Sequence, residues 1–124
     1  MQAVVDMFGP ADFSLFEFIG LEKAMSVFGA SSATDPIFAQ ASPVTWVSSD
    51  DPPFLILHGE EDPIVPLPQS QSLYDHLQAA GVPVELVVVK NAGHGFKPTG
   101  GRIDPSRSDI SEMIAFFFDR WLKE

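Results

Sequence analysis

Two polar residues follow two apolar stretches of the sequence, and together they could transfer a proton. Asp62 comes soon after the apolar stretch 53–59, and His94 comes after the stretch 84–89, between two glycines. A carboxylate that accepts a hydrogen bond from one imidazole nitrogen fixes the tautomer of the ring and stabilises the charge it gains as a general base. The pair Asp62 and His94 therefore predicts general acid–base chemistry.

These two residues can meet if the stretches before them are neighbouring parallel strands. Residues 53–59 and 84–89 are almost continuous apolar runs, which is typical of strands buried on both faces of a parallel sheet. Between them, residues 68–80 predict a helix with a first-turn proline and an apolar face that includes Leu73, and Gly81 predicts its end. Functional residues of such sheets lie on loops after the carboxyl ends of the strands. We therefore expect both residues at one edge of the sheet.

The first half of the chain is less regular. Residues 3–8 predict a third buried strand, with a helix as the alternative, because this apolar run is short and stops at a Gly-Pro pair. Residues 12–28 fit no single hydrophobic period and predict one or two short helices, broken at Gly20 and ended at Gly29. Residues 29–51, rich in Ser, Ala, Thr and Pro, predict a loop with at most one or two helical turns.

The C-terminal part predicts a loop followed by a helix. Residues 91–107 hold several glycines and prolines and predict a loop. A helix is expected from about 109 to 122, where Asp109 and Glu112 resemble a capping box. Its apolar stripe predicts packing against the sheet.

Composition and charge limit the classes of partner. The 124 residues carry a formal net charge of −10, and a surface of that sign repels phosphate backbones, so nucleic acid is not expected as a partner. No apolar run is long enough to span a bilayer, and the first residues lack the basic region of a signal peptide. The sequence has no cysteine, which fits a reducing compartment. We expect a cytoplasmic protein without membrane contact.

The histidines do not predict a metal site or a cofactor. The sequence has 3 histidines without the spacing of metal ligands, and no cysteine. His58 is expected to be a structural residue at the end of a strand, and His76 is expected to be solvated. Neither a metal ion nor an organic cofactor is predicted.

The longest motif-bearing stretch, 51–96, reads DPPFLILHGEEDPIVPLPQSQSLYDHLQAAGVPVELVVVKNAGHGF. It resembles the C-terminal part of an α/β-hydrolase, most of all the esterase/lipase group that borders on the prolyl-oligopeptidase-like enzymes. The resemblance implies that Asp62, in the pattern H-G-x-x-D-x-x-V-P, is the acid of a catalytic triad. It also implies that His94, in A-G-H-G-F, is the base.

The resemblance extends over essentially the whole chain and implies an α/β fold. It predicts three layers, α/β/α, with the last three parallel strands of the family's sheet and flanking helices, so that residues 1–124 form a single partial domain. The family's serine lies on a G-x-S-x-G turn, and the sequence lacks one; the most similar string is 29–33. The resemblance therefore implies a carboxylic-ester hydrolase whose nucleophile lies upstream, and a chain that is inactive alone. A serine peptidase of the prolyl-oligopeptidase type is the alternative for the same triad.

Two hypotheses from other classes also fit parts of the sequence. In the strand order that the resemblance implies, the strand at 3–8 would pair with a strand absent from this chain and would have an open apolar edge. Such an edge favours self-association into a homo-oligomer without catalysis. A receiver-like phosphate acceptor, with Asp62 as the acceptor and Lys90 at a strand end, is the weaker hypothesis.

Overall fold

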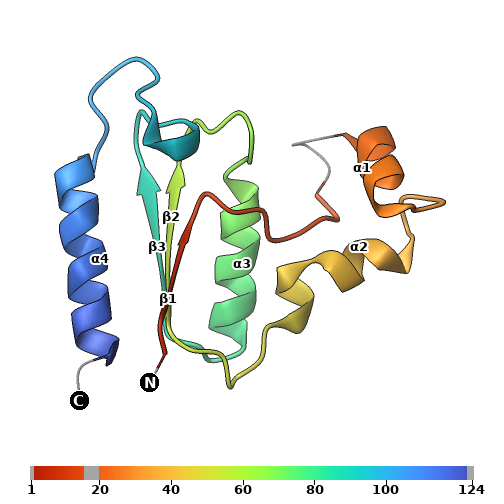
Figure 1. Cartoon of the computed structure of the whole chain (residues 1–124), viewed down its shortest axis with the longest axis horizontal. Helices are drawn as coiled ribbons and strands as arrows, with labels where there is room; N and C mark the ends of the chain where they lie inside the picture. The colour runs from red at the N-terminus through yellow and green to blue at the C-terminus, as the bar shows by residue number, and fades with distance from the viewer. Residues whose placement is uncertain (1, 16–19, 123–124) are drawn as a thin grey trace.

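The computed structural model describes residues 2–15 and 20–122, and in them three parallel strands form one sheet. The strands are β1 (Val4–Met7), β2 (Phe54–Gly59) and β3 (Val84–Val89), in the order β1-β2-β3. Val5 pairs with Leu55, which in turn pairs with Glu85. All three predicted strands are present, and their carboxyl ends lie at the same edge of the sheet (Figure 1). The expected burial holds for β2, whereas β1 and β3 are mostly half-buried.

A helix covers each face of the sheet. α3 (Pro68–Ala79) lies on one side and α4 (Arg107–Leu122) on the other, so the predicted three-layer α/β/α arrangement is confirmed (Figure 1). Side chains alternate along β2, which sends Ile56 toward α3 and Leu55 and Leu57 toward α4. The cluster under α3 contains Ala11, Val44, Ile56, Leu73, Leu77 and Val82. The cluster under α4 contains Leu55, Leu57, Val89, Ala92, Phe96, Ile103, Ile110 and Phe117.

The helical stretch expected within 12–28 forms in its second half. α1 (Leu21–Phe28) begins after Gly20 and ends at Gly29, whose φ of 68° is in the left-handed region that glycine favours. Residues 16–19 lie outside the described part of the chain, so the helix expected before Gly20 is not tested there.

The segment 29–51 contains more helix than its composition predicts. α2 (Pro36–Ala41) starts at Asp35, whose carboxylate accepts a hydrogen bond from the amide of Ile37. The 3-10 helix η2 (Pro43–Trp46) follows directly. Proline at the first helical position of each element is compatible with helix, because its missing N–H would have no intrahelical acceptor there.

The capping box expected for the last helix was wrong by one turn. α4 begins at Arg107, and the hydroxyl of Ser106 accepts a hydrogen bond from the amide of Asp109 at 3.1 Å. The Asp109 carboxylate accepts one from the amide of Ser106 at 3.4 Å. Asp109 is thus the third residue of the helix rather than its cap, and Glu112 has no part in the box.

A buried glutamine ties the segment after β1 to α3. The side-chain oxygen of Gln69 accepts hydrogen bonds from the amides of Ala11 and Asp12, each at 2.8 Å, and its nitrogen donates to the Asp12 carbonyl at 2.8 Å. Burial opposes ionisation of the Asp12 carboxyl, but hydrogen bonds from Ser14 and Ser72 outweigh it and hold its pKa below the ordinary value. The hydrogen bonds of Gln69 therefore fix the position of the segment that leaves the carboxyl end of β1.

Candidate active site

Two loops at the carboxyl edge of the sheet bring together the residues singled out in the sequence. The acid loop, residues 60–66, follows β2, and the histidine loop, residues 91–99, follows β3. The short 3-10 helix η3 (His94–Phe96) carries the histidine and lies at the carboxyl ends of β2 and β3 (Figure 1). The two loops therefore lie side by side, as parallel pairing of β2 and β3 requires.

Asp62 and His94 form a direct hydrogen bond. Nδ1 of His94 lies 2.8 Å from Oδ2 of Asp62, and the other carboxylate oxygen accepts from the amides of Ile64 and Val65 at 2.8 and 2.9 Å. The Asp62 side chain is fully buried, whereas that of His94 is 33% exposed. A carboxylate can only accept, so Nδ1 carries the proton and Nε2 is left to receive one. This is the arrangement expected of a general base held by an acid.

The histidine loop turns sharply through left-handed backbone. Gly95 and Phe96 have φ angles of 69° and 62°. Arg107, at the start of α4, donates to the carbonyl oxygens of both residues, at 3.2 and 3.3 Å. A guanidinium that binds two carbonyls stabilises a turn that non-glycine residues adopt only at a cost. The helix α4 thereby supports the loop that presents His94.

The two loops approach each other too closely for a side chain at Gly59. A Cβ atom there would lie 2.5 Å from the carbonyl oxygens of both Ala92 and Gly93. The Glu61 amide donates to the Ala92 carbonyl at 3.0 Å, and the Thr99 hydroxyl donates to the Glu61 carboxylate at 2.8 Å. Glycine at the end of β2 therefore sets the distance between the acid and the base.

Phe8 is a site residue that the sequence did not single out. Its ring packs edge-on against the His94 imidazole with centroids 4.8 Å apart, and against Phe96 at 5.1 Å. Phe8 follows β1 with a φ of 47°. Its position at the end of a predicted strand was the signal that could have identified it from the sequence. Apolar residues at such positions, however, usually only pack in the core. Here the ring restricts the orientation of the imidazole.

A second acidic group lies near the carboxyl end of β1. Burial raises the pKa of the Asp6 carboxyl above its ordinary value, and a hydrogen bond from the Gly9 amide opposes that rise only in part.

The other histidines have structural surroundings, as expected. His76 is exposed on α3, and its ring bonds the carbonyl of Ser72. His58 is fully buried and lies 2.6 Å from the Ser70 hydroxyl and 3.5 Å from Asp62. Ser70, His58 and Asp62 thus place a hydroxyl, an imidazole and a carboxylate side by side, as in a catalytic triad. Ser70 and His58 are 0% exposed, however, so the Ser70 hydroxyl cannot attack a substrate.

The described residues do not place a serine on the nucleophile turn. The string at 29–33 lies between α1 and α2, and Ser31 bonds the Asp35 carboxylate there. Asp62 cannot serve as a phosphate acceptor either, because its carboxylate is buried and fully hydrogen-bonded. In residues 2–15 and 20–122, no group of three or more acidic or histidine side chains is arranged to hold a metal ion.

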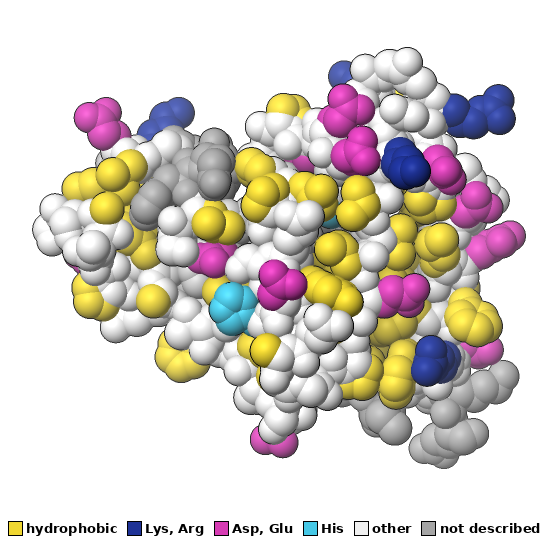
Figure 2. Space-filling view, turned by 180° about the vertical axis from the view of Figure 1, so that it is seen from behind, with side chains coloured by type: hydrophobic (Ala, Val, Ile, Leu, Met, Phe, Trp, Pro, Cys, Tyr) yellow, Lys and Arg dark blue, Asp and Glu magenta, His cyan; other side chains and the backbone are white. Residues whose placement is uncertain are grey.

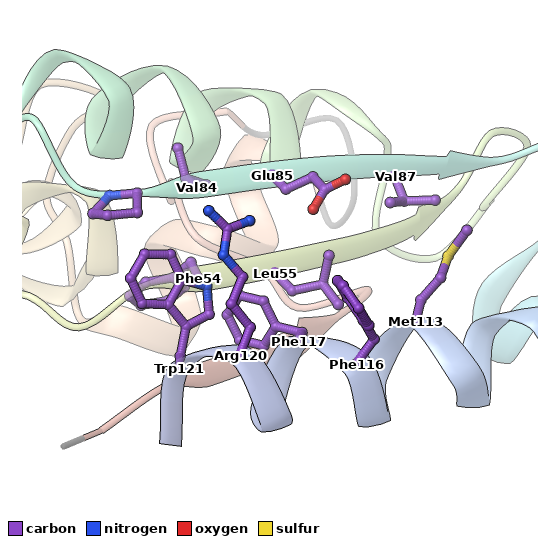
Figure 3. Close-up of a pocket in the computed structure, with 11 residues that line it drawn as sticks. Phe54, Leu55, Val84, Glu85, Val87, Met113, Phe116, Phe117, Arg120 and Trp121 are labelled. Atoms are coloured by element: carbon purple, nitrogen blue, oxygen red, sulfur yellow. The ribbon is translucent and has the colours of Figure 1, made fainter. Parts of the chain in front are cut away.

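A groove of about 580 Å³ lies between β3 and α4, away from the Asp62–His94 pair. Figure 3 shows Glu85 on β3 and Arg120 on α4 projecting into it, with Phe116 and Trp121 among its apolar walls. Seen from behind, this half of the molecule carries many hydrophobic side chains among acidic ones (Figure 2). The groove is a hollow at the free edge of β3 and contains none of the site residues.

Comparison with known proteins places this geometry in a family. A BD-FAE family model matches residues 1–77, which is more than half of the chain. The chain belongs to the BD-FAE family. The match includes Asp62 and ends before His94. Among curated relatives, the BD-FAE chain is 33% identical over 107 residues to a probable carboxylic ester hydrolase, LipM, of Mycobacterium tuberculosis, covering 81% of this chain and 25% of LipM.

Solved structures show the same fold over nearly the whole BD-FAE chain. A truncated carbohydrate esterase from gut microbiota matches 98% of it with a TM-score of 0.72 and 28% identity. An acylaminoacyl peptidase of Pyrococcus horikoshii also matches 98%, with a TM-score of 0.80 and 25% identity. The α/β-hydrolase fold expected from the resemblance is confirmed. The chain covers 43% and 20% of these two proteins, respectively.

Within the described ranges, no helix is both long and apolar enough to cross a membrane.

Substituting Gly59 tests the close approach of the two loops. Gly59→Ala is expected to lower the free energy of unfolding by about 1–3 kcal/mol, because the methyl group would overlap two backbone carbonyls. Urea denaturation followed by circular dichroism measures this loss. Gly93→Ala is the matched control, since its Cβ would meet its nearest neighbour at 3.4 Å. Equal losses in the two variants would contradict the account.

Proposed function

We propose that this chain is the C-terminal part of a serine hydrolase that cleaves carboxylic esters. Asp62 is the triad acid and His94 is the triad base in this proposal, and residues 1–124 form one partial domain. The observation that carries it is the 2.8 Å hydrogen bond between a buried carboxylate and a partly exposed imidazole. The esterase names of several relatives, LipM, LipQ and LipC, support esters as the substrate class.

In the proposed reaction, a serine outside this chain attacks the ester carbonyl and forms a C–O bond while its proton passes to Nε2 of His94. The imidazolium then donates that proton to the oxygen of the leaving alcohol as the ester C–O bond breaks. Water repeats both steps on the acyl-serine and releases the acid. Asp62 accepts the Nδ1 hydrogen bond throughout and stabilises the positive charge of the ring.

The test is hydrolysis of p-nitrophenyl acetate by the longer protein that contains this chain. His94→Ala and Asp62→Asn are expected to lower kcat by about 10³–10⁴-fold, because one removes the base and the other its correct tautomer. His76→Ala, an exposed histidine on α3, is the matched control and should keep full activity. The isolated chain should show no turnover.

Two results would contradict this function. Turnover by the isolated chain that His94→Ala abolishes would place the nucleophile within residues 1–124. Full activity of the Asp62→Asn variant would show that the reaction does not need the Asp62 carboxylate. A peptide anilide assayed in parallel separates the alternatives, since several relatives and structural neighbours are named peptidases. Preference for the anilide would favour the peptidase alternative.

A second proposal concerns the isolated chain, which we expect to self-associate through β1. β1 pairs with β2 on one side, and the described residues place no strand on its other side. A groove of about 530 Å³ lies beside β1, lined in part by Val5, Pro52 and the 67% exposed Trp46. Unpaired strand edges favour pairing with another strand.

We also propose a cytoplasmic location, which the absence of cysteine supports.

Light scattering tests the self-association. We expect a mass above the 13.5 kDa of one chain. Because the amides of Val4 and Phe8 point toward β2, that of Met7 points to the open edge. Met7→Pro is therefore expected to favour the monomer while leaving the β1–β2 bonds in place, and Met7→Ala is the control. A monodisperse, cooperatively folding monomer of the unmodified chain would contradict the proposal.

A further inference from the structure

A second imidazole lies directly behind the triad acid and is not used by the mechanism above. His58 is fully buried at the end of β2. Its Nε2 lies 2.6 Å from the carbonyl oxygen of Val65 and 3.5 Å from Oδ2 of Asp62. Its Nδ1 lies 2.6 Å from the hydroxyl of Ser70, in α3. The ring therefore connects the acid loop with a helix of the core.

The partners of the ring determine where its proton is. A carbonyl oxygen can only accept, so Nε2 of His58 carries hydrogen and donates to Val65. Nδ1 is then an acceptor for the Ser70 hydroxyl. The same nitrogen lies 3.5 Å from Oδ2 of Asp62, a distance that adds electrostatic attraction rather than a hydrogen bond.

This network acts on the residues that hold the acid. The Val65 amide donates to Oδ1 of Asp62 at 2.9 Å, and the Val65 carbonyl is the group that His58 binds. Fixing Val65 on both sides fixes the orientation of the carboxylate, so that Oδ2 faces Nδ1 of His94. No buried side-chain polar atom in the described residues lacks a partner, so each member of the network is held.

We propose that His58 is a positioning residue, which together with Ser70 locks the acid loop in the geometry that the Asp62–His94 pair requires. This inference rests on the proposed function for its effect on rate. Its effect on the geometry of the pair does not depend on that function. An apolar side chain at position 58 would leave the Val65 carbonyl and the Ser70 hydroxyl buried without partners.

The experiment compares His58→Leu with His58→Gln, whose amide nitrogen can replace Nε2 as a donor. In the longer protein, His58→Leu is expected to lower kcat for p-nitrophenyl acetate by about 10²-fold with little change in KM, because the acid and base are misaligned rather than the substrate unbound. His58→Gln should recover at least tenfold of that loss. His76→Gln, on the exposed face of α3, is the matched control.

A second readout separates positioning from general stability. Nitrogen-15 NMR of the His94 ring reports which nitrogen carries the proton at a pH where the ring is neutral. We expect the Nδ1–H tautomer to predominate in the unmodified protein and in His58→Gln, and to lose its predominance in His58→Leu. If His58→Leu does not fold, Ser70→Ala provides the test, with an expected loss in kcat of about fivefold for one hydrogen bond.

The results of these experiments distinguish the positioning role of His58 from the proposed function. A folded His58→Leu variant with unchanged kcat and an unchanged His94 tautomer overturns the positioning role, as does an unchanged Ser70→Ala variant if that one has to be used. An unmodified longer protein that cleaves no ester, but whose His94 tautomer still depends on His58, contradicts the proposed function and supports the positioning role.

Discussion

The hydrogen bond between the Asp62 carboxylate and the His94 imidazole is the constraint on which the site depends. It joins two residues that are 32 positions apart in sequence, and it requires β2 and β3 to be parallel neighbours with a fixed register. The absence of a side chain at Gly59 lets the loops approach, and the α4 residue Arg107 holds the turn that presents the imidazole. A buried acid and a partly exposed base are the result.

Much of this architecture could be predicted because its signals are local. β2 and β3 are nearly continuous apolar runs between helices, and β2 is buried almost throughout, whereas only Val89 of β3 is buried. Parallel strands place their following loops at one edge. Asp62 and His94 could be selected for the same reason, as polar residues directly after such strands. Gly29 and Gly81 predicted the ends of α1 and α3, because glycine readily adopts the positive φ angle that ends many helices. Their φ angles are 68° and 80°.

The remainder depends on contacts between distant segments, which no local pattern contains. The spacing that suggested a capping box at Asp109 and Glu112 occurs equally between Ser106 and Asp109, and only the helix start in three dimensions decides between them. The packing of Phe8 against His94 joins the segment after β1 to the loop after β3, which are far apart in sequence. His58 was expected to be structural, and it is buried, but its link to Ser70 and the acid loop is visible only in the fold.

The central claim is that His94 and Asp62 serve a serine that lies outside these 124 residues. The most direct measurement is to react the longer protein with a fluorophosphonate, which bonds covalently to activated serines, and to locate the label by peptide mass spectrometry. The account predicts one labelled serine outside residues 1–124, and no label in the His94→Ala variant. A label on a serine within residues 1–124, or labelling that does not depend on His94, would contradict it.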